Sequence, residues 1–318
     1  QDYELLSDIG GVDDLSYLYL ARFKGEHLVA LKYTDLTLSP DFEFIQDLVC
    51  TVQNTNLCAH PHILPYFLTF VENERLWTVT LPMRGGSCRH LMKTHYPRGF
   101  SETAVATLLK PVLTAVAYLH ANHLIHNDIR ANNILLDRQG DVRLTGMRSL
   151  VSLSQGGEYV KSVFQLMGDN IEWAAPEVMA QNANYNQKAD IYSFGITVLE
   201  LYYNKTPFDD WAPLKVLLCK LRYDCPAIDQ TYDADPQGAA GTPAPPQAHD
   251  TAETRRARLA DVRIMSPHLQ NLVQACLQKD PAARPSAAEL LHHPFFKQAR
   301  GREYLEQKLL HVLGPAGE

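Results

Sequence analysis

The sequence lacks the features that mark secreted, zinc-binding or membrane-spanning chains. Only six of its 318 residues are cysteine, with no CxxC pair and no cysteine–histidine spacing typical of a zinc site. No apolar run reaches the length of a membrane span, and no secretory signal peptide stands at the start. We therefore expect reduced thiols in a cytoplasmic chain, and neither disulfides nor zinc.

Positive charge is also scarce. The formal net charge is −7, and the longest basic cluster is the short run around Arg255, Arg256 and Arg258. Nucleic-acid binding or attraction to an anionic membrane would need a larger basic excess. We expect neither nucleic acid nor membrane among the partners. A hydrophobic content of 46% with 20% charged residues predicts a globular chain with a substantial core, as one two-lobed domain or two small ones.

The first 80 residues alternate between apolar and polar positions. This pattern predicts strands at 3–10, 15–23 and 27–36, and two more strands on either side of the turn 72–74. A helix is expected at 41–57. Five strands and one helix would make a small, mainly β first lobe.

The later sequence predicts a larger helical lobe. Paired glycines at 81–87 indicate a hinge, and helices are expected at 102–121 and, buried nearly all round, at 188–201. Residues from about 229 to 258 consist largely of Pro, Ala, Gly, Thr and Gln, so we expect a disordered insert there. A C-terminal helical tail is predicted at 301–318.

A polar loop and two short strands stand between these helices. The loop holds His126, Asn127 and Asp128, and Asn133 follows five residues after the aspartate. Apolar residues at 134–136 and 142–144 flank a polar turn, which predicts a hairpin with site residues at its mouth. The sequence Gly-Met-Arg then follows at 146–148.

This motif order resembles the protein kinases, in which a His-Arg-Asp loop ending in Asn precedes an Asp-Phe-Gly turn. The resemblance implies an α+β, two-lobed fold over residues 1–300, with an N-lobe at 1–83, a hinge at 81–87 and a C-lobe at 87–300. It also implies that Asp190 braces the catalytic loop and that Glu177 pairs with Arg284.

The resemblance assigns the catalytic positions and shows which of them are changed. Asp128 would accept a hydroxyl proton and Asn133 would hold a metal. Gly146 stands eighteen residues after Asp128, where the metal-binding aspartate belongs, and glycine has no ligand atom. We therefore predict no metal site. Arg148 adds a cation that could face phosphates in the metal's stead, and Asn127 replaces the arginine that reads a phosphorylated activation loop.

The nucleotide-binding positions are partly retained. Carboxylates at Asp13 and Asp14 would repel phosphates, and we interpret Gly10-Gly11 as a strand turn more than a phosphate clamp. The helix glutamate that should orient the strand lysine is replaced by Thr51, with Asp47 as a substitute one turn earlier. The positions that the resemblance assigns to ATP are Gly10, Ala30, Lys32, Thr80, Leu81, Met83, Leu135 and Arg148.

Within the kinases, the sequence resembles the sterile-twenty-related adaptor (STRAD) pseudokinases. The resemblance rests on DIYSFGITVLEL, the Gly-x-Arg turn, the low-complexity insert and HPFFKQ. It implies an adaptor that holds a liver-kinase-B-type serine/threonine kinase active together with an armadillo-like scaffold protein. The contact surface would be 150–173, beside a groove built by 211–221. The Trp-Glu-Phe scaffold motif of that family is absent from the C-terminal residues given, and retention of Asp128 departs from it.

These observations predict a pseudokinase adaptor that binds ATP without magnesium-dependent catalysis. The first alternative is a weakly active STE-group serine/threonine kinase that uses Asp128 and Asn133. The second is a nucleotide-sensing scaffold with no kinase client. The expected location is the cytoplasm, with shuttling to the nucleus.

Overall fold

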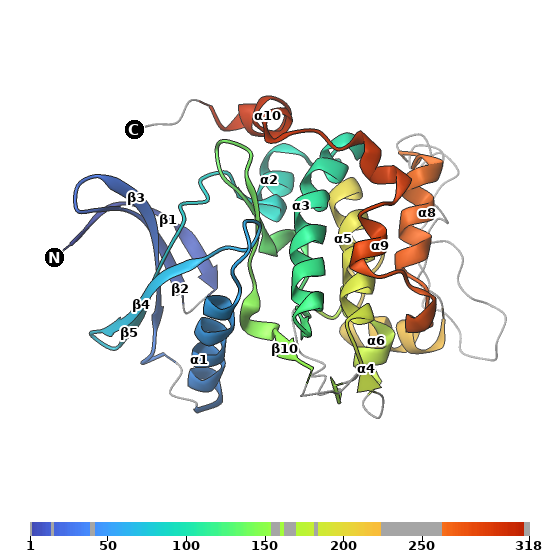
Figure 1. Ribbon diagram of the computed structural model, residues 1–318, viewed down its shortest axis with the longest axis horizontal. Coiled ribbons are helices and arrows are strands. Elements are labelled where there is room, and N and C mark those ends of the chain that lie inside the picture. The colour runs from blue at the N-terminus through green and yellow to red at the C-terminus, as the bar shows by residue number, and fades with distance from the viewer. Residues whose placement is uncertain are drawn as a thin grey trace, which may run out of the picture.

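The computed structural model describes residues 2–13, 16–38, 42–153, 160–161, 170–180, 184–223 and 263–314. They form two lobes, with the sheet of the first lobe on one side and the helices of the second lobe on the other (Figure 1). This is the predicted α+β, two-lobed fold of a protein kinase. The expected insert at 229–258 lies outside the described residues.

The N-lobe is a five-stranded antiparallel sheet with one helix. The strand order is β1-β2-β3-β5-β4, so β3 pairs with β5 across an intervening helix and strand, while the other neighbours are consecutive along the chain. Its core is formed by Ala21, Val29, Leu31 and Val79, packed against aromatic rings. The elements are β1 (Tyr3–Asp13), β2 (Ser16–Phe23), β3 (His27–Asp35), α1 (Phe42–Leu57), β4 (Tyr66–Glu72) and β5 (Arg75–Thr80).

The first strand is longer than predicted, and the predicted turn at Gly10-Gly11 is wrong. Strand β1 continues through both glycines to Asp13, with Gly10 opposite Leu18. The register is irregular between Asp8 and Gly10 and again between Gly11 and Asp13. Glycine within a strand commonly accompanies such bulges, so here the two glycines mark an irregular strand.

The C-lobe is built around α3 (Glu102–Ala121) and α5 (Lys188–Tyr203). Both helices form at the predicted positions, α5 two residues longer, and apolar residues of both join the largest core cluster. Ser101 caps α3 by accepting a hydrogen bond from the Ala104 N–H. Helix α3 is long and apolar enough to cross a membrane, but 61% of its most apolar window is buried within the lobe. We interpret it as a core helix.

Shorter elements complete the C-lobe. The helices are α2 (Cys88–His95), α4 (Pro176–Met179), α6 (Pro213–Arg222), α8 (Pro267–Cys276), α9 (Ala287–Leu290) and α10 (Arg302–Leu305). The strands are β6 (Gly86–Ser87), β7 (Leu124–Ile125), β8 (Ile134–Leu136), β9 (Val142–Leu144), β10 (Val151–Ser152), β11 (Val160–Lys161) and β12 (Asn184–Tyr185). The hairpin of β8 and β9 forms with the predicted bounds, and β6 pairs with its β8 edge.

The C-terminal tail returns to this hairpin. Helix α10 continues in helical turns to Leu313 and buries Leu305, Leu309 and Leu310. The hydroxyl of Tyr96 donates to the carbonyl of Leu309 at 2.7 Å. The turn between β8 and β9 lies so close that a Cβ on Gly140 would approach the carbonyl oxygen of Arg302. The tail therefore packs on the hairpin that carries the site residues (Figure 1).

Candidate functional site

Asp190, on α5, holds the loop that carries the site. Its buried carboxylate accepts the N–H groups of His126 and Asn127, both at 2.8 Å, and contacts His120 Nε2 at 2.9 Å. Burial raises the pKa of Asp190, but the contacts with His120 and His126 outweigh it and lower the pKa below its usual value. The carboxylate is thus charged where the loop needs an acceptor, which is the predicted role.

His126 connects this loop to the turn that follows β9. Its Nδ1 accepts the N–H of Asp128 at 3.2 Å, so its Nε2 carries the proton and donates to the carbonyl of Thr145 at 3.0 Å. Burial lowers the pKa of this imidazole. A neutral His126 therefore fixes the spacing between Asp128 and the turn that contains Gly146.

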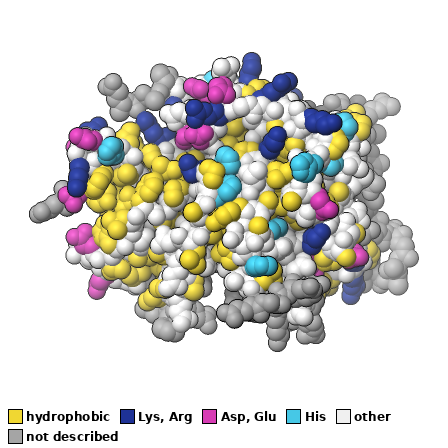
Figure 2. All heavy atoms as spheres, viewed as in Figure 1, with side chains coloured by type: hydrophobic (Ala, Val, Ile, Leu, Met, Phe, Trp, Pro, Cys, Tyr) yellow, Lys and Arg dark blue, Asp and Glu magenta, His cyan; other side chains and the backbone are white. Residues whose placement is uncertain are grey.

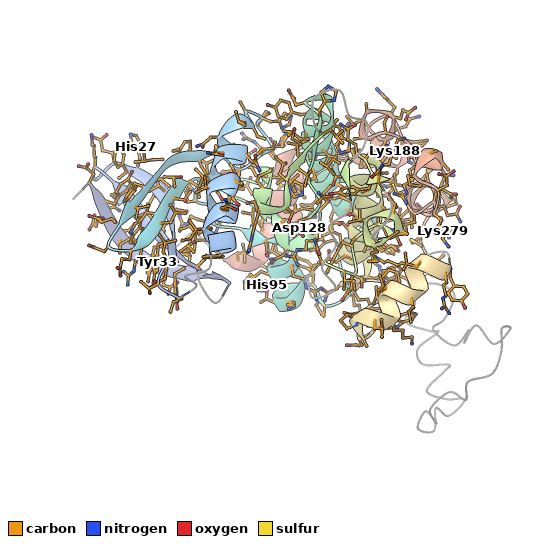
Figure 3. All side chains as sticks on the ribbon, turned by 90° about the horizontal axis from the view of Figure 1, so that it is seen from below. His27, Tyr33, His95, Asp128, Lys188 and Lys279 are labelled. Atoms are coloured by element: carbon orange, nitrogen blue, oxygen red, sulfur yellow. The ribbon has the colours of Figure 1, made fainter. Side chains whose placement is uncertain are left out.

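Asp128 and Asn133 lie together, and each engages the other. One oxygen of the Asp128 carboxylate lies 2.9 Å from Arg130 Nε, and the other accepts Asn133 Nδ2 at 2.7 Å. The same amide nitrogen donates to the carbonyl of Asp128 at 2.8 Å. Figure 3 shows Asp128 between the N-lobe and the C-lobe helices. Both carboxylate oxygens are therefore occupied in this arrangement.

At Gly146, the position of the replaced metal ligand, the Asn133 side chain lies close to the backbone. Its φ of +94° lies in the region that favours glycine. A Cβ built there would lie 2.5 Å from Asn133 Nδ2 and 2.7 Å from Asn133 Cγ. The Asn133 amide thus lies where the Cβ of an aspartate would stand, and it would have to shift to admit that side chain. No group of three or more His, Cys, Asp or Glu side chains that could hold a metal occurs among the residues that the structure describes.

The other two residues of this turn point to different surroundings. Met147 is buried in the C-lobe core, as the phenylalanine of the kinase turn would be. Arg148 is exposed, and its guanidinium carbon lies 5.7 Å from the ring centroid of Phe44 in α1. Arg148 therefore contacts the N-lobe helix across the gap between the lobes.

The strand residues assigned to ATP lie on adjacent strands. Ala30 is buried in β3 opposite Thr80 of β5, and Lys32 stands two residues further along β3 with a half-buried side chain. The hydroxyl of Thr80 donates to the carbonyl of Pro65 at 2.6 Å. Thr51 lies on α1, as counted. The side chains of Asp13 and Asp47, and all of Asp14, lie outside what the structure describes.

The hinge groups assigned to adenine contact each other. The Met83 N–H donates to the carbonyl of Leu81 at 3.1 Å, across Pro82. Leu135 lies on β8, opposite Ser87 of β6 just beyond the hinge. An adenine that uses both hinge groups would have to replace this short contact. The predicted roles therefore need a small rearrangement of the hinge.

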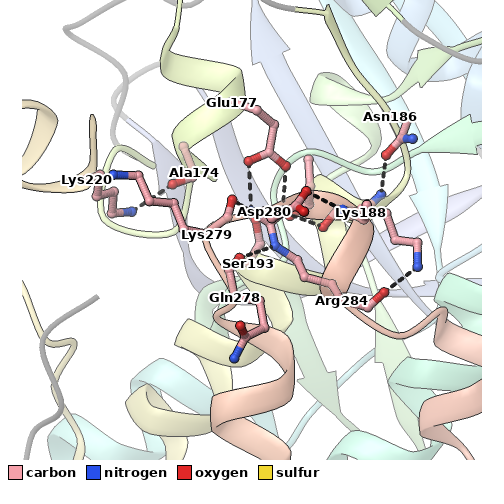
Figure 4. A network of polar contacts seen from close by, with 12 residues as sticks. Ala174, Glu177, Asn186, Lys188, Ser193, Lys220, Gln278, Lys279, Asp280 and Arg284 are labelled. Atoms are coloured by element: carbon pink, nitrogen blue, oxygen red, sulfur yellow. Dashed lines mark hydrogen bonds and ion pairs between the residues drawn. The ribbon is translucent and has the colours of Figure 1, made fainter. Parts of the chain in front are cut away.

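Sequence reasoning missed Lys220, which is 1% exposed on α6. Its ammonium donates to the carbonyls of Ile171, Glu172 and Ala174 at 3.0, 2.6 and 2.7 Å, and lies 4.6 Å from the ring centroid of Phe208. Figure 4 shows Lys220 beside Ala174. The one signal was its spacing: Lys220 follows the buried Val216 by four residues, on the same helix face.

Glu200 was also missed, although it lies in the predicted buried helix α5. One of its oxygens accepts the Ala131 N–H and Trp173 Nε1–H, both at 2.9 Å. Burial raises its pKa from 4.5 to about 7, against the opposing effect of these hydrogen bonds. Glu200 therefore joins the catalytic loop to the end of the segment predicted as a contact surface.

The predicted pair of Glu177 and Arg284 forms a two-pronged contact. The distances are 2.5 and 2.9 Å between guanidinium nitrogens and carboxylate oxygens, and Arg284 is 1% exposed (Figure 4). Arg284 also donates to the carbonyl of Gln278 at 2.7 Å. This pair joins α4, which follows the segment, to the chain near Gln278.

The surface predicted at 150–173 is described only at its ends and at 160–161. Val151 of β10 pairs with Ile125 of β7, and Val160 of β11 pairs with Tyr185 of β12. Residues 154–159 and 162–169 lie outside the described residues. Beside this segment, α6 turns an apolar face outward that consists of Leu214, Leu218 and Leu221. Lys220, on the buried side of the same helix, connects this helix to the end of the segment through its hydrogen bonds.

Comparison with known proteins agrees with this geometry. A family model described as the protein kinase domain matches residues 15–296. The chain is 36% identical to human STE20-related kinase adapter protein alpha over 94% of its own length and 74% of the relative. It is 33% identical to the human beta protein, over 99% of this chain and 79% of the relative.

A protein with a different name is similarly related. Serine/threonine-protein kinase fray2 of Dictyostelium discoideum is 36% identical over 91% of this chain, which spans 25% of that relative's length. The shared fold therefore covers kinases as well as adapters. The chain belongs to the protein kinase domain family, and its similarity to the STE20-related kinase adapter proteins extends over nearly its whole length.

Proposed function

We propose that this protein is a pseudokinase that acts as an allosteric adaptor for a serine/threonine kinase of the liver-kinase-B type. The observation that carries the proposal is the Asn133 amide, which occupies the space where the side chain of a metal-binding aspartate would stand at Gly146. Phosphoryl transfer depends on metal ions that neutralise phosphate charge, and this turn supplies no ligand. The names of the adapter relatives support the same function.

The retained fold supports a binding role. An adaptor shifts a client's equilibrium when it binds the active conformation of the client better than the inactive one. Such binding needs a fixed surface, and the outer apolar face of α6 is held from inside by the buried contacts of Lys220. Exposed apolar residues of this kind are typical of protein interfaces. We propose that the client kinase contacts this face and the adjoining segment.

A second exposed apolar surface supports binding of a scaffold. Phe67, Leu68 and Val71 on β4 are 50–64% exposed, and Ile45 and Val49 on the neighbouring α1 are 38% and 49% exposed. Apolar side chains gather over the N-lobe in Figure 2. We propose that the armadillo-like scaffold protein covers this surface, so that client and scaffold use different lobes.

ATP binding without magnesium is part of the proposal. Lys32 and Arg148 provide cations on the two sides of the gap between the lobes, and cations can neutralise phosphates in the absence of metal. A thermal-shift titration with ATP in EDTA tests this point, with magnesium added in a parallel series. Stabilisation that is equal in both series is expected. No stabilisation in either series would exclude nucleotide binding.

Reconstitution tests the adaptor function itself. The client kinase and the scaffold are combined with the wild-type chain or with Leu218→Asp, which places a carboxylate on the outer face of α6. We expect client activity to rise severalfold with wild type and much less with the variant. Leu28→Asp, at a similarly exposed apolar position on β3, is the control that should activate normally. Equal activity with and without wild type would contradict the proposal.

A weakly active kinase is the second candidate, favoured by the retained Asp128 and Asn133. Transfer of radiolabelled phosphate to a generic substrate separates the two functions, with Asp128→Asn as the matched variant. Transfer by the wild type that Asp128→Asn abolishes would establish catalysis. The occupied carboxylate of Asp128 favours the opposite result, in which neither protein transfers phosphate.

A further inference from the structure

The C-terminal tail, residues 302–314, contacts two elements that lie far from it in the sequence. The hydroxyl of Tyr96, at the end of α2, donates to the carbonyl of Leu309 at 2.7 Å. A guanidinium nitrogen of Arg138, in the turn between β8 and β9, donates to the carbonyl of Gly314 at 2.8 Å. The tail therefore bridges α2 and the hairpin.

The tail and the hairpin turn meet backbone against backbone. A Cβ built on Gly140 would lie 2.3 Å from the carbonyl oxygen of Arg302 and 3.0 Å from its carbonyl carbon. Gly140 also has a φ of +82°, in the region that favours glycine. Backbone atoms cannot rotate aside as the end of a flexible side chain can, so a larger residue at this position would separate the tail from the turn.

Apolar side chains fix the tail to the same two elements. Leu305, Leu309 and Leu310 are 1–4% exposed and belong to the same buried cluster as Met92 of α2 and Leu136 of β8. Burial of apolar surface is the main favourable contribution to packing of this kind. The tail is therefore held by a shared core as well as by hydrogen bonds.

The hairpin that the tail contacts is bonded in turn to the hinge. The Gly85 N–H donates to the carbonyl of Leu136 at 2.9 Å, and β6 pairs with β8 so that Ser87 lies opposite Leu135. Leu135 is one of the positions assigned to ATP, and α2 follows β6 directly. We call β6, α2 and the hairpin of β8 and β9 the hinge unit.

We propose that the tail is a brace that holds the hinge unit in one arrangement, so that detaching the tail loosens the hinge. Strand β6 has two residues and β8 and β9 have three each. Such short strands form few hydrogen bonds of their own, so their order depends on what packs against them. A weaker nucleotide site would follow from a loosened hinge, and this consequence rests on the proposed ATP binding.

Hydrogen exchange on the full chain tests the proposal. The main variant is Gly140→Ala, in which the added Cβ displaces the tail from the turn. We expect residues 85–95 and 134–144 to exchange roughly tenfold faster than in the wild type, together with the tail. Peptides of α5, in the core of the lobe, should keep the wild-type rate. Gly25→Ala is the matched control, because Gly25 has a φ of +74° but no atom within 4 Å of a built Cβ.

A milder variant covers the case in which Gly140→Ala does not fold. Tyr96→Phe removes only the hydroxyl that donates to the Leu309 carbonyl, and we expect about threefold faster exchange in the same peptides. Its control is Tyr304→Phe, because the hydroxyl of Tyr304 makes only an exposed contact with Ser101 at 3.4 Å. Faster exchange confined to the tail would overturn the proposal, because the hinge unit would then be ordered without it. Wild-type rates throughout both variants would overturn it as well.

The outcome is separable from that of ATP binding. Exchange is measured without nucleotide, and a thermal-shift titration with ATP is run on the wild type and on Gly140→Ala, which should bind severalfold more weakly. If ATP does not stabilise the wild type but Gly140→Ala loosens the hinge unit, ATP binding fails and the brace stands. If ATP stabilises both proteins equally and only the tail exchanges faster, the brace fails alone.

Discussion

Two regions of the C-lobe differ in how their charged groups are used. The first region, which we call the altered turn, comprises Asp128 and Asn133 of the loop and Gly146 of the turn. Its polar side chains are hydrogen-bonded to each other beside Gly146. In the buried C-lobe contacts, made by Lys220, Glu200 and the pair of Glu177 and Arg284, charges are enclosed and bind backbone or partner groups. Of the groups that would perform chemistry, Asp128 and Asn133 are retained and the metal-binding aspartate is replaced by Gly146, while the groups that shape the surface are in place.

The difference shows which property the structure supports. A buried charge is costly unless it is fully paired, so its presence indicates that the geometry around it is fixed. Lys220 and Glu200 both contact residues 171–174, from different helices. These contacts therefore hold residues 171–174 in place, as the proposed binding function requires.

The largest effect is expected at Lys220. Lys220→Met should lower the free energy of unfolding by about 3 kcal/mol, because three buried carbonyls lose their donor. Urea unfolding measures it. The control is Lys215→Met on the exposed side of the same helix, where the ammonium lies over Trp211 and a loss under about 1 kcal/mol is expected. Equal losses would show that the buried hydrogen bonds of Lys220 contribute no more than an exposed lysine of the same helix.

Glu200 should make stability depend on pH. Its pKa rises from 4.5 to about 7 on folding, so its contribution is present in full below pH 4.5 and is lost as the pH rises through 7. Between pH 4.5 and 8, Glu200 should therefore lower the free energy of unfolding of the wild type by up to about 3 kcal/mol. Glu200→Gln, which stays neutral, should lack this part of the pH dependence. Unfolding in urea at a series of pH values measures it.

The exposed Glu289 provides a control of opposite sign. Hydrogen bonds from Ser286 lower its pKa, so its contribution is present above the ordinary pKa and lost as the pH falls through the lowered value. Glu289→Gln should therefore alter the acid side of the profile only. A Glu200→Gln protein with the wild-type slope between pH 4.5 and 8 would show that Glu200 is ionised throughout.

Gly146→Asp tests whether the altered turn can be repaired. The variant should lose about 1–3 kcal/mol of stability and gain no magnesium-dependent transfer, because its Cβ displaces the Asn133 amide from Asp128. Gly25→Asp is the control for backbone strain alone, because Gly25 has a φ of +74° but no atom within 4 Å of a built Cβ that would have to be displaced. Thermal unfolding and radiolabelled phosphate transfer are measured on both.

Either of two results would change this interpretation. If Gly146→Asp and Gly25→Asp lose the same stability, the Asn133 amide moves aside at no cost. If Gly146→Asp transfers phosphate in the presence of magnesium, one side chain separates this chain from an active kinase. The weakly active alternative would then describe the molecule better.

The sequence predicted elements whose pattern is local. The helix at 102–121 and the hairpin strands 134–136 and 142–144 formed with the predicted bounds because apolar period and turn residues specify them within a few residues. The turn at Gly10-Gly11 was wrong because pairing with β2 carries the strand past both glycines. Tertiary pairing overrode the local preference of glycine.

Site residues could be predicted where a motif fixes their spacing. They could not be predicted where their position depends on backbone groups far away in the sequence. Asp128, Asn133 and Gly146 lie together as their intervals implied. The burial of Lys220 depends on carbonyls 46–49 residues earlier, and no hydropathy pattern marks a lysine as internal. The contact between Met83 and Leu81 was equally invisible, because it follows from the local path of the hinge.

The smallest effect is expected at the surface ion pair of the tail. Arg302 lies 3.4 Å from Asp141, with the two side chains 58% and 43% exposed. Water screens such a pair, so Arg302→Ala should change the free energy of unfolding by less than about 0.5 kcal/mol. Leu309→Ala in the same tail should cost about 2–4 kcal/mol, because Leu309 is 3% exposed and its loss leaves a cavity. If Arg302→Ala lowered the free energy of unfolding as much as Lys220→Met, burial would not explain which charges stabilise this lobe. The exposed ion pair of the tail would then count among the contacts that stabilise the C-lobe.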